Sequence, residues 1–182
     1  MHAWPPTTPL RIARLSAEHA APYRSLMLEA YELAADAFTS TPAERAGEPE
    51  AWWIKRIADP DGLSAAFGAF DGQELIGTVA LEFSAKPKTR HKALIIGMYV
   101  TPACRGSGAG KSLLAAAIAH AQARPGLLVV QLTVTQGNDS AIGLYRAAGF
   151  ETFGTEPMAI LTPGGFRGKL HMWRSVAANP AG

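Results

Sequence analysis

The segment from residue 93 to residue 134 constrains the fold more than any other part of the chain. It holds two apolar runs, ALIIGMYV at residues 93–100 and LLVVQLTV at residues 127–134, each short enough for a buried strand. Between them lie a glycine-rich stretch, RGSGAGKS at residues 105–112, and a stripe of apolar residues at helical spacing. A strand, a glycine turn, a helix and a second strand make one crossover unit. The pattern therefore predicts a central sheet with at least one helix packed on it.

Strand and helix patterns continue on both sides of this unit. Asp71-Gly72 separates two strand-like runs, residues 64–70 and 74–83, and is a strong hairpin signal. Other strands are expected at residues 10–15, at residues 150–154 and as a final pair around residues 163–165. Helices are expected after Ser16, at the capping box Thr41-Pro42-Ala43-Glu44, before Pro60 and from Asn138 to Gly149. The fold class is predicted to be α+β (mixed α/β) with one central sheet.

Length and composition narrow the class of protein. A chain of 182 residues, 48% hydrophobic and 18% charged, suits a single domain, predicted at residues 10–176 between a flexible arm at 1–9 and a flexible tail at 177–182. The formal charge of +2, without a basic run, argues against nucleic acid and anionic membranes as partners. No stretch approaches a membrane span or a signal peptide, and Cys104 is the single cysteine, so a cytoplasmic location is expected.

The glycine-rich stretch predicts a site for phosphate. A turn that leads from a strand into a helix points several backbone N–H groups at one spot, and glycines let phosphate oxygens approach closely. The P-loop of nucleotide hydrolases is one interpretation, but its pattern G-x-x-x-x-G-K-[ST] requires a first glycine where this chain has Arg105. A magnesium-binding aspartate is also missing at the end of residues 127–134. The P-loop interpretation is therefore disfavoured.

A second pattern, [QR]-x-x-G-x-[GA], matches Arg105 to Gly110. The segments MYVTPACRGSGAGKSLL and LTVTQGNDSAIGLYRAAGF together resemble the acetyl-CoA-binding core of the GNAT superfamily of N-acetyltransferases. The resemblance is clearest over residues 93–150 and extends more weakly upstream. It implies a three-layer fold with a mostly antiparallel twisted sheet of about seven strands, helices on both faces, and a parallel strand pair that splays apart at the acetyl-CoA site.

The resemblance also implies roles for individual residues. The expected coenzyme A ligands are Met98, Tyr99, Val100, Arg105, Gly106, Ser107, Gly108, Ala109, Gly110, Lys111, Asn138 and Ser140. Tyr145 matches the family tyrosine that lies near the thioester sulfur. Each has a simpler alternative: Tyr145 as core, Asn138 as a helix cap, and Arg105 and Lys111 as solvated charges. No metal is implied, and the spacing of the histidines suggests none.

The general base is the open part of this account. Many members of the family carry a glutamate on the strand before the glycine loop, whereas residues 93–100 contain no carboxylate. Glu82 on the preceding strand and His91 at the entrance of the strand are the candidates, against a solvated glutamate and a surface histidine. Trp52, Trp53 and Phe38 lie where the family builds acceptor pockets, although aromatic residues at helical spacing are more often core.

These observations predict an N-acetyltransferase that moves an acetyl group from acetyl-CoA to a primary amine of a small molecule or peptide. Transfer is expected by direct attack in a ternary complex, with acetyl-CoA as co-substrate and without metal. A non-catalytic acyl-CoA-binding module and a P-loop nucleotidase are the alternatives. A homodimer is a further expectation, because sheet edges and exposed aromatic residues favour self-association.

Overall fold

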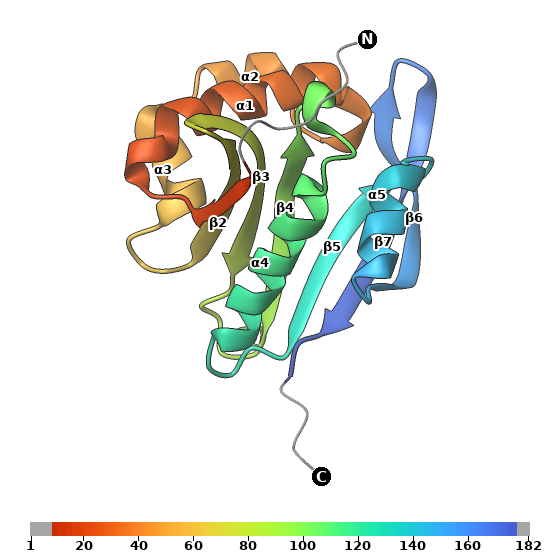
Figure 1. The fold of residues 1–182 in the computed structure, drawn as a ribbon. Helices are drawn as coiled ribbons and strands as arrows, with labels where there is room; N and C mark the ends of the chain where they lie inside the picture. Colours follow the sequence, from red (N-terminus) through yellow and green to blue (C-terminus); the bar gives the residue numbers. More distant parts are fainter. Residues whose placement is uncertain (1–8, 178–182) are drawn as a thin grey trace.

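One seven-stranded sheet organises the protein (Figure 1), whose computed structural model describes residues 9–177. The strand order is β1-β2-β3-β4-β5-β7-β6, and all neighbours are antiparallel except the parallel pair β4 and β5. The strands are β1 (Arg11–Arg14), β2 (Ser64–Asp71), β3 (Glu74–Phe83), β4 (Lys92–Val100), β5 (Val129–Thr135), β6 (Glu151–Thr162) and β7 (Gly165–Ser175). The predicted mostly antiparallel sheet with one parallel pair is confirmed.

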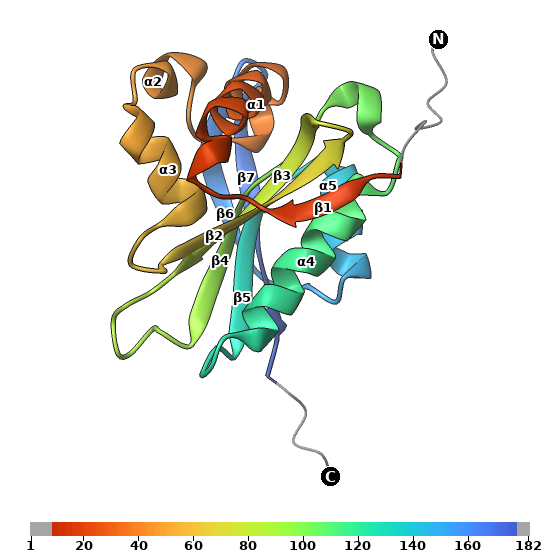
Figure 2. The same cartoon turned by 60° about the vertical axis from the view of Figure 1, so that its left-hand side comes forward.

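Helices cover both faces of the sheet, as expected (Figure 2). On one face, α1 and α3 bury a cluster that contains Tyr23, Met27, Trp53 and Ile57. On the other face, the apolar stripe of α4, including Leu113, packs together with α5 on a second cluster. The helices are α1 (Ala20–Leu33), α2 (Pro42–Ala46), α3 (Glu50–Ala58), α4 (Ala109–Ala123) and α5 (Asp139–Ala147), with 3₁₀ turns η1 (Ala17–His19), η2 (Ala35–Ala37) and η3 (Pro102–Cys104).

Local signals in the sequence account for several boundaries. The predicted capping box is present at α2: the Glu44 N–H donates to Thr41 Oγ1 at 3.2 Å, and the Thr41 N–H donates to Glu44 Oε2 at 2.7 Å. Ser16 caps the turn η1, which runs directly into α1, rather than α1 itself. Asn138 caps α5. Short-range hydrogen bonding therefore sets these ends.

The C-terminal hairpin differs from its prediction. The expected strand at residues 150–154 and the first strand of the final pair are one long strand, β6, which pairs with β7. The register shifts between Glu156 and Ile160, where Pro157 offers no N–H to the ladder and Met158 has a φ of 51°. Pro157 therefore lies at a bulge in β6 and does not end the strand.

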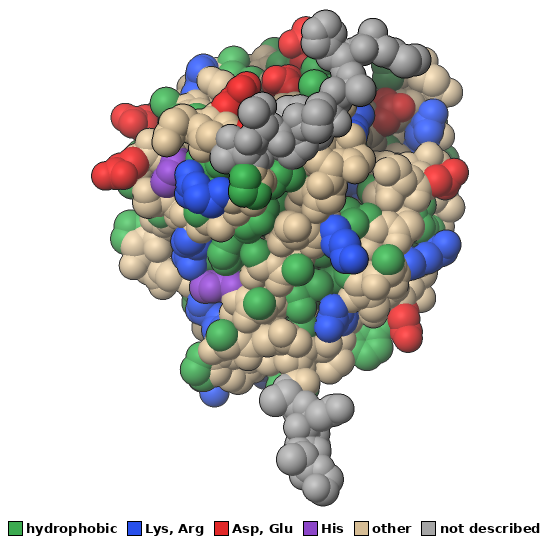
Figure 3. Space-filling model, in the orientation of Figure 1, with side chains coloured by type: hydrophobic (Ala, Val, Ile, Leu, Met, Phe, Trp, Pro, Cys, Tyr) green, Lys and Arg blue, Asp and Glu red, His purple; other side chains and the backbone are tan. Residues whose placement is uncertain are grey.

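The predicted arm at residues 1–9 and the predicted tail at residues 177–182 lie outside the described residues, apart from Pro9 and Ala177. The single domain at residues 10–176 stays a prediction. On the face shown in Figure 3, the described basic and acidic side chains are interspersed with apolar and polar surface.

The parallel pair β4 and β5 is splayed, as the resemblance implied. The two strands pair only at Lys92 with Val129, Ala93 with Val130 and Leu94 with Gln131. Beyond Leu94 the strands diverge, so that their carboxyl ends are separated (Figure 1). The separation leaves one edge of β4 unpaired in the interior of the sheet, next to the glycine loop.

Candidate functional site

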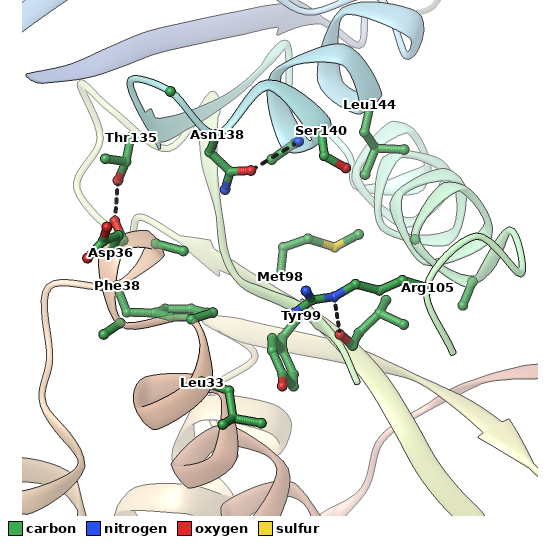
Figure 4. A pocket seen from close by; sticks show the side chains of 18 of the residues that line it. Leu33, Asp36, Phe38, Met98, Tyr99, Arg105, Thr135, Asn138, Ser140 and Leu144 are labelled. Atoms are coloured by element: carbon green, nitrogen blue, oxygen red, sulfur yellow. Dashed lines mark hydrogen bonds between the residues drawn. The ribbon is translucent and has the colours of Figure 1, made fainter. Parts of the chain in front are cut away.

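The splay of the sheet opens into a cleft of about 860 Å³. Figure 4 shows side chains from four parts of the chain around it: the end of α1 with η2, the end of β4, the glycine loop, and the turn from β5 into α5. All of the coenzyme A ligands expected from the sequence line this cleft except Ser107. The crossover unit therefore brings together residues that lie up to about forty positions apart in the chain.

The glycine loop forms a cradle of free N–H groups at one end of the cleft. Gly106 and Gly108 have φ angles of 80° and 86°, which favour glycine, and Gly108 is the N-cap of α4. The N–H groups of Gly108, Gly110 and Lys111 have no acceptor among residues 9–177. The positive end of the α4 dipole lies at the same place. An anion such as a pyrophosphate fits this arrangement.

Two side chains of the loop bond to neighbouring backbone groups. Ser107 turns inward: its Oγ donates to the Cys104 carbonyl at 2.6 Å and accepts from the Ala109 N–H at 3.3 Å. Ser107 therefore shapes the loop instead of lining the cleft. The Nε of Arg105 donates to the Val100 carbonyl at 3.2 Å, so this side chain lies along β4 while it still lines the cleft.

The end of β4 presents its unpaired edge to the cleft. Met98 lines it from the strand (Figure 4), and the backbone beyond Leu94 has no partner strand on this side. The ring of Tyr99 packs on the α1 face, where its hydroxyl donates to Glu29 at 2.9 Å. Burial and this hydrogen bond raise the pKa of Tyr99 to about 12. An extended ligand could pair with the open edge as an added strand does.

Asn138 combines the two roles that the sequence left open. Its Oδ1 accepts from the Ala141 N–H at 3.3 Å, which caps α5, while the residue also lines the cleft. The amide nitrogen stays free to meet a ligand (Figure 4). Ser140 lies exposed on the same rim.

A second cavity, of about 300 Å³, continues from the cleft through the splay. Phe38, Met98, Asn138 and Leu144 line both spaces. Tyr145 reaches the second cavity from α5, on the α4 face of the sheet, and Glu82 reaches it from β3. The two spaces together connect one face of the sheet with the other.

Tyr145 is both a core residue and a cavity residue. It is 6% exposed and packs edge-on against Phe150 with ring centroids 6.1 Å apart. No described residue accepts a hydrogen bond from its hydroxyl, and burial raises the pKa of Tyr145 to about 12. The phenol is therefore protonated at neutral pH, so it can serve as a general acid but not as a general base.

The two candidates for the general base lie in different places. Glu82 lines the second cavity, opposite Leu94 in the register of β3 and β4. His91 precedes β4 at its other end, where its carbonyl accepts from Leu128 and Val129, and it lines neither space. At about 3.3 Å per residue, His91 lies roughly 23 Å along the strand from Met98. The structure does not bring His91 to the site.

Sequence reasoning missed several residues around the second cavity. These residues come from elements whose tertiary position no local pattern reveals: Tyr31, Thr39, Ser40, Arg45, Arg56 and Lys169. One missed residue had a signal: Gly97 is an isolated glycine in an apolar strand, which indicates a bulge. Its φ is 59°, and the register of β3 and β4 shifts beside it, between Thr78 and Ala80.

Among residues 9–177, no three His, Cys, Asp or Glu side chains come together as a group that could hold a metal ion. No helix in the described part of the chain is long and apolar enough to cross a membrane.

Comparison with solved structures supports the fold assignment. The chain is similar to a GNAT-family acetyltransferase of Streptococcus pneumoniae, with a TM-score of 0.76 and 24% identity over 92% of this chain and 99% of the other. It is also similar to yncA of Salmonella typhimurium, whose structure was solved with its cofactor acetyl-CoA, with a TM-score of 0.78 and 19% identity over 96% and 98% of the two chains. These likenesses establish the fold.

Comparison of sequences establishes the family. Two curated relatives are named mycothiol acetyltransferases: that of Rhodococcus jostii is 37% identical over 110 residues, and that of Streptomyces scabiei is 33% identical over 115 residues. The matches cover 59% and 63% of this chain but 33% of each relative, so the chain spans about a third of their length. The family model of the GNAT acetyltransferases matches residues 27–150, well over half of the chain. This protein therefore belongs to the GNAT family of acetyltransferases.

Proposed function

We propose that this protein transfers an acetyl group from acetyl-CoA to a primary amine of a small molecule or peptide, by direct attack in a ternary complex. One observation carries the proposal: the splay between β4 and β5 joins the cradle of free N–H groups to a cavity that holds Tyr145 and Glu82. Such a passage can hold a long phosphorylated thioester at one end and an amine at the other. The acceptor stays unidentified.

The residues of the cleft fit coenzyme A as co-substrate. The N–H groups of Gly108, Gly110 and Lys111 would hold the pyrophosphate at the start of α4. The open edge of β4 would pair with the amide groups of the pantetheine arm, and Asn138 would donate its free amide hydrogens to the same arm. A thioester bound in this way reaches the second cavity near Met98.

The reaction then needs a general base, a hydrogen-bond donor to the oxyanion and a general acid. An amine with a pKa near 10.4 is about 0.1% neutral around pH 7.4, so it must lose a proton before its nitrogen can form a bond to the thioester carbon. Glu82 would accept this proton through water. A backbone N–H of β4 near Met98 would stabilise the oxyanion. When the carbon–sulfur bond breaks, Tyr145 would donate to the departing thiolate.

Glu82→Gln is expected to lower kcat/KM about 20-fold, because an amide cannot accept the proton that the attacking ammonium must lose. The affinity for acetyl-CoA should stay within about 2-fold, since Glu82 lies outside the larger cleft. Steady-state kinetics and calorimetric titration measure the two quantities. The matched control is His91→Gln, which should leave both unchanged because His91 lies at the far end of β4. A loss of rate in His91→Gln with none in Glu82→Gln would reverse the assignment.

The test of the proposed function is calorimetric titration with acetyl-CoA, with Mg-ATP under the same conditions, followed by an amine panel. We expect micromolar binding of acetyl-CoA, none of Mg-ATP, and free thiol release with at least one amine. Saturable binding of Mg-ATP alone would refute the proposal. Binding of acetyl-CoA without turnover on any amine would favour the second candidate, a non-catalytic acyl-CoA-binding module.

A cytoplasmic location and a homodimer stay predictions. The buried free Cys104 fits a reducing compartment. Exposed apolar side chains on the hairpin of β6 and β7, among them Phe153 and Leu161, fit an interface between two copies.

A further inference from the structure

Arg56 is a cation beside the second cavity, and Tyr23 and Glu82 lie close enough to favour its charge without a close ion pair. Arg56 of α3 lines the second cavity, and within residues 9–177 no carboxylate lies within 4.0 Å of its guanidinium. Its Nε is buried without a hydrogen-bond partner among these residues. A buried donor without an acceptor is costly, so the Nε of Arg56 points to a ligand that accepts its hydrogen bond.

A second buried donor points to the same spot. The hydroxyl of Tyr23 is fully buried and has no hydrogen-bond partner among the described residues. A Cβ placed on Gly97 would lie 3.6 Å from Tyr23 Oη and 3.9 Å from Arg56 Nη2, so the two groups converge over this glycine. Burial raises the pKa of Tyr23, only partly offset by Arg56, and keeps the hydroxyl protonated as a donor. The Met27 methyl lies 3.8 Å from the same Cβ, and of these groups Arg56 and Gly97 line the second cavity while Tyr23 lies behind them.

The other charges around the second cavity make it suited to a zwitterion. Arg45 is already engaged by Glu48 at 3.1 Å and by Ser40 at 3.0 Å. Arg56 and Lys169 are left as cations without an ion-pair partner in the described part of the chain, and Glu82 is the carboxylate of the cavity. A ligand with one negative and one positive group would satisfy both signs.

We propose that Arg56, positioned by the Tyr23 hydroxyl behind it, binds the carboxylate of the acceptor, and that the acceptor is a free α-amino acid. This inference rests on the proposed function, because it assigns a substrate class to the same site.

The position of Arg56 determines how far the carboxylate lies from the attacked amine. Gly97 directly precedes Met98, near which the thioester carbon is placed in the proposed function, so an anion on Arg56 would lie one residue along β4 from the reacting centre. In an α-amino acid the carboxylate and the amine share one carbon, which matches this short separation. An acid several methylenes from its amine, or the amine of a protein N-terminus, which has no adjacent carboxylate, does not.

Packing alone does not account for Arg56. Its guanidinium lies 5.0 Å from the centroid of the Trp52 ring, a cation–π contact that helps to orient it. That contact leaves the Nε of Arg56 and the hydroxyl of Tyr23 without acceptors. The planar guanidinium of an arginine can bind a carboxylate through two parallel hydrogen bonds, that is, in a bidentate way.

The test compares acids with their amides. The twenty L-amino acids and their primary amides are assayed with acetyl-CoA on the wild type, Arg56→Gln and Arg56→Lys. We expect the best amino acid to be acetylated with a KM about 30-fold lower than that of its amide. Arg56→Gln should raise the KM of the acid about 30-fold and change that of the amide by less than about 3-fold, with partial rescue by Arg56→Lys. Calorimetric titration of the same amino acid into CoA-saturated protein should follow the same order.

The outcomes separate this inference from the proposed function. If acetyl-CoA does not bind the wild type, the proposed function itself fails. If acetyl-CoA binds but amides and decarboxylated amines react as well as the acids, or if no amino acid reacts, the amino-acid inference is refuted. If Arg56→Gln lowered kcat equally for the acid and its amide, the inference would also be refuted. The guanidinium would then stabilise the oxyanion of the reaction and not the carboxylate of the acceptor.

Discussion

Gly108→Asp is expected to weaken the binding of acetyl-CoA about 100-fold or more while the protein stays folded. Gly108 is the N-cap of α4 with a φ of 86°, and a Cβ placed on it meets no atom within 4 Å. Aspartate tolerates the left-handed region at a cost of about 1 kcal/mol. Its carboxylate would face the pyrophosphate. Repulsion from two phosphate charges, each about 5 Å from the carboxylate, would cost roughly 3 kcal/mol in total at an effective dielectric of about 40. Calorimetric titration with acetyl-CoA measures the loss.

The matched control is Gly108→Asn, which has the same shape and the same backbone cost but no charge. Its affinity should fall less than about 10-fold, and both variants should unfold at similar temperatures. The difference between them reports the charge of the ligand at this spot. Equal affinities of the two variants would mean that no phosphate lies at the start of α4.

The sequence predicted the crossover unit well because its signals are local. The glycines of the loop, the apolar stripe of α4 and the capping residues each depend on neighbours within a few positions. The order of these pieces then determines where they lie in the sheet. Residues 105–111 could therefore be assigned to the cleft before any coordinates, and only Ser107 turned away from it, to bond the carbonyl of Cys104.

The acceptor side could not be predicted in the same way. Arg56, Tyr23 and Gly97 come from α3, α1 and β4, and their meeting depends on how the helices cross the sheet. In the sequence, Arg56 is only one residue of the helix expected before Pro60, and Tyr23 is only one residue of the helix expected after Ser16. Their unsatisfied donors become visible only when every buried polar group is accounted for in three dimensions.

The two candidates for the base illustrate the same limit. Both Glu82 and His91 lie near β4 in sequence, but an antiparallel neighbour such as β3 places its residues by register, not by distance along the chain. Glu82 pairs opposite Leu94, where the splay begins, whereas His91 stays at the closed end of the strand. The direction of β4 therefore separates two residues that the pattern could not rank.

Tyr145→Phe is expected to lower kcat roughly 100-fold while the affinity for acetyl-CoA stays within about 2-fold. The hydroxyl has no acceptor among the described residues, so its removal leaves the packing against Phe150 intact and costs little stability. What is lost is a donor to the departing thiolate, worth roughly 3 kcal/mol in a site shielded from water. Steady-state kinetics with a saturating amine, together with the titration, measure both quantities.

The pH dependence distinguishes a donor from a base at this position. Burial raises the pKa of Tyr145 to about 12, so the proton is fully present below about pH 10 and is lost only as the pH rises through about 12. The wild-type rate should therefore climb with pH as the amine deprotonates and show no descending limb up to about pH 10. Burial also raises the pKa of a thiol that leaves into this site, so the pKa values of the phenol and the thiol stay closer to each other than the phenol's raised pKa alone would allow. If the wild-type rate fell with pH below about pH 9 and that fall were absent in Tyr145→Phe, the raised pKa of the buried phenol would be contradicted. If the kcat of Tyr145→Phe were unchanged, water and not Tyr145 would donate the proton to the thiolate.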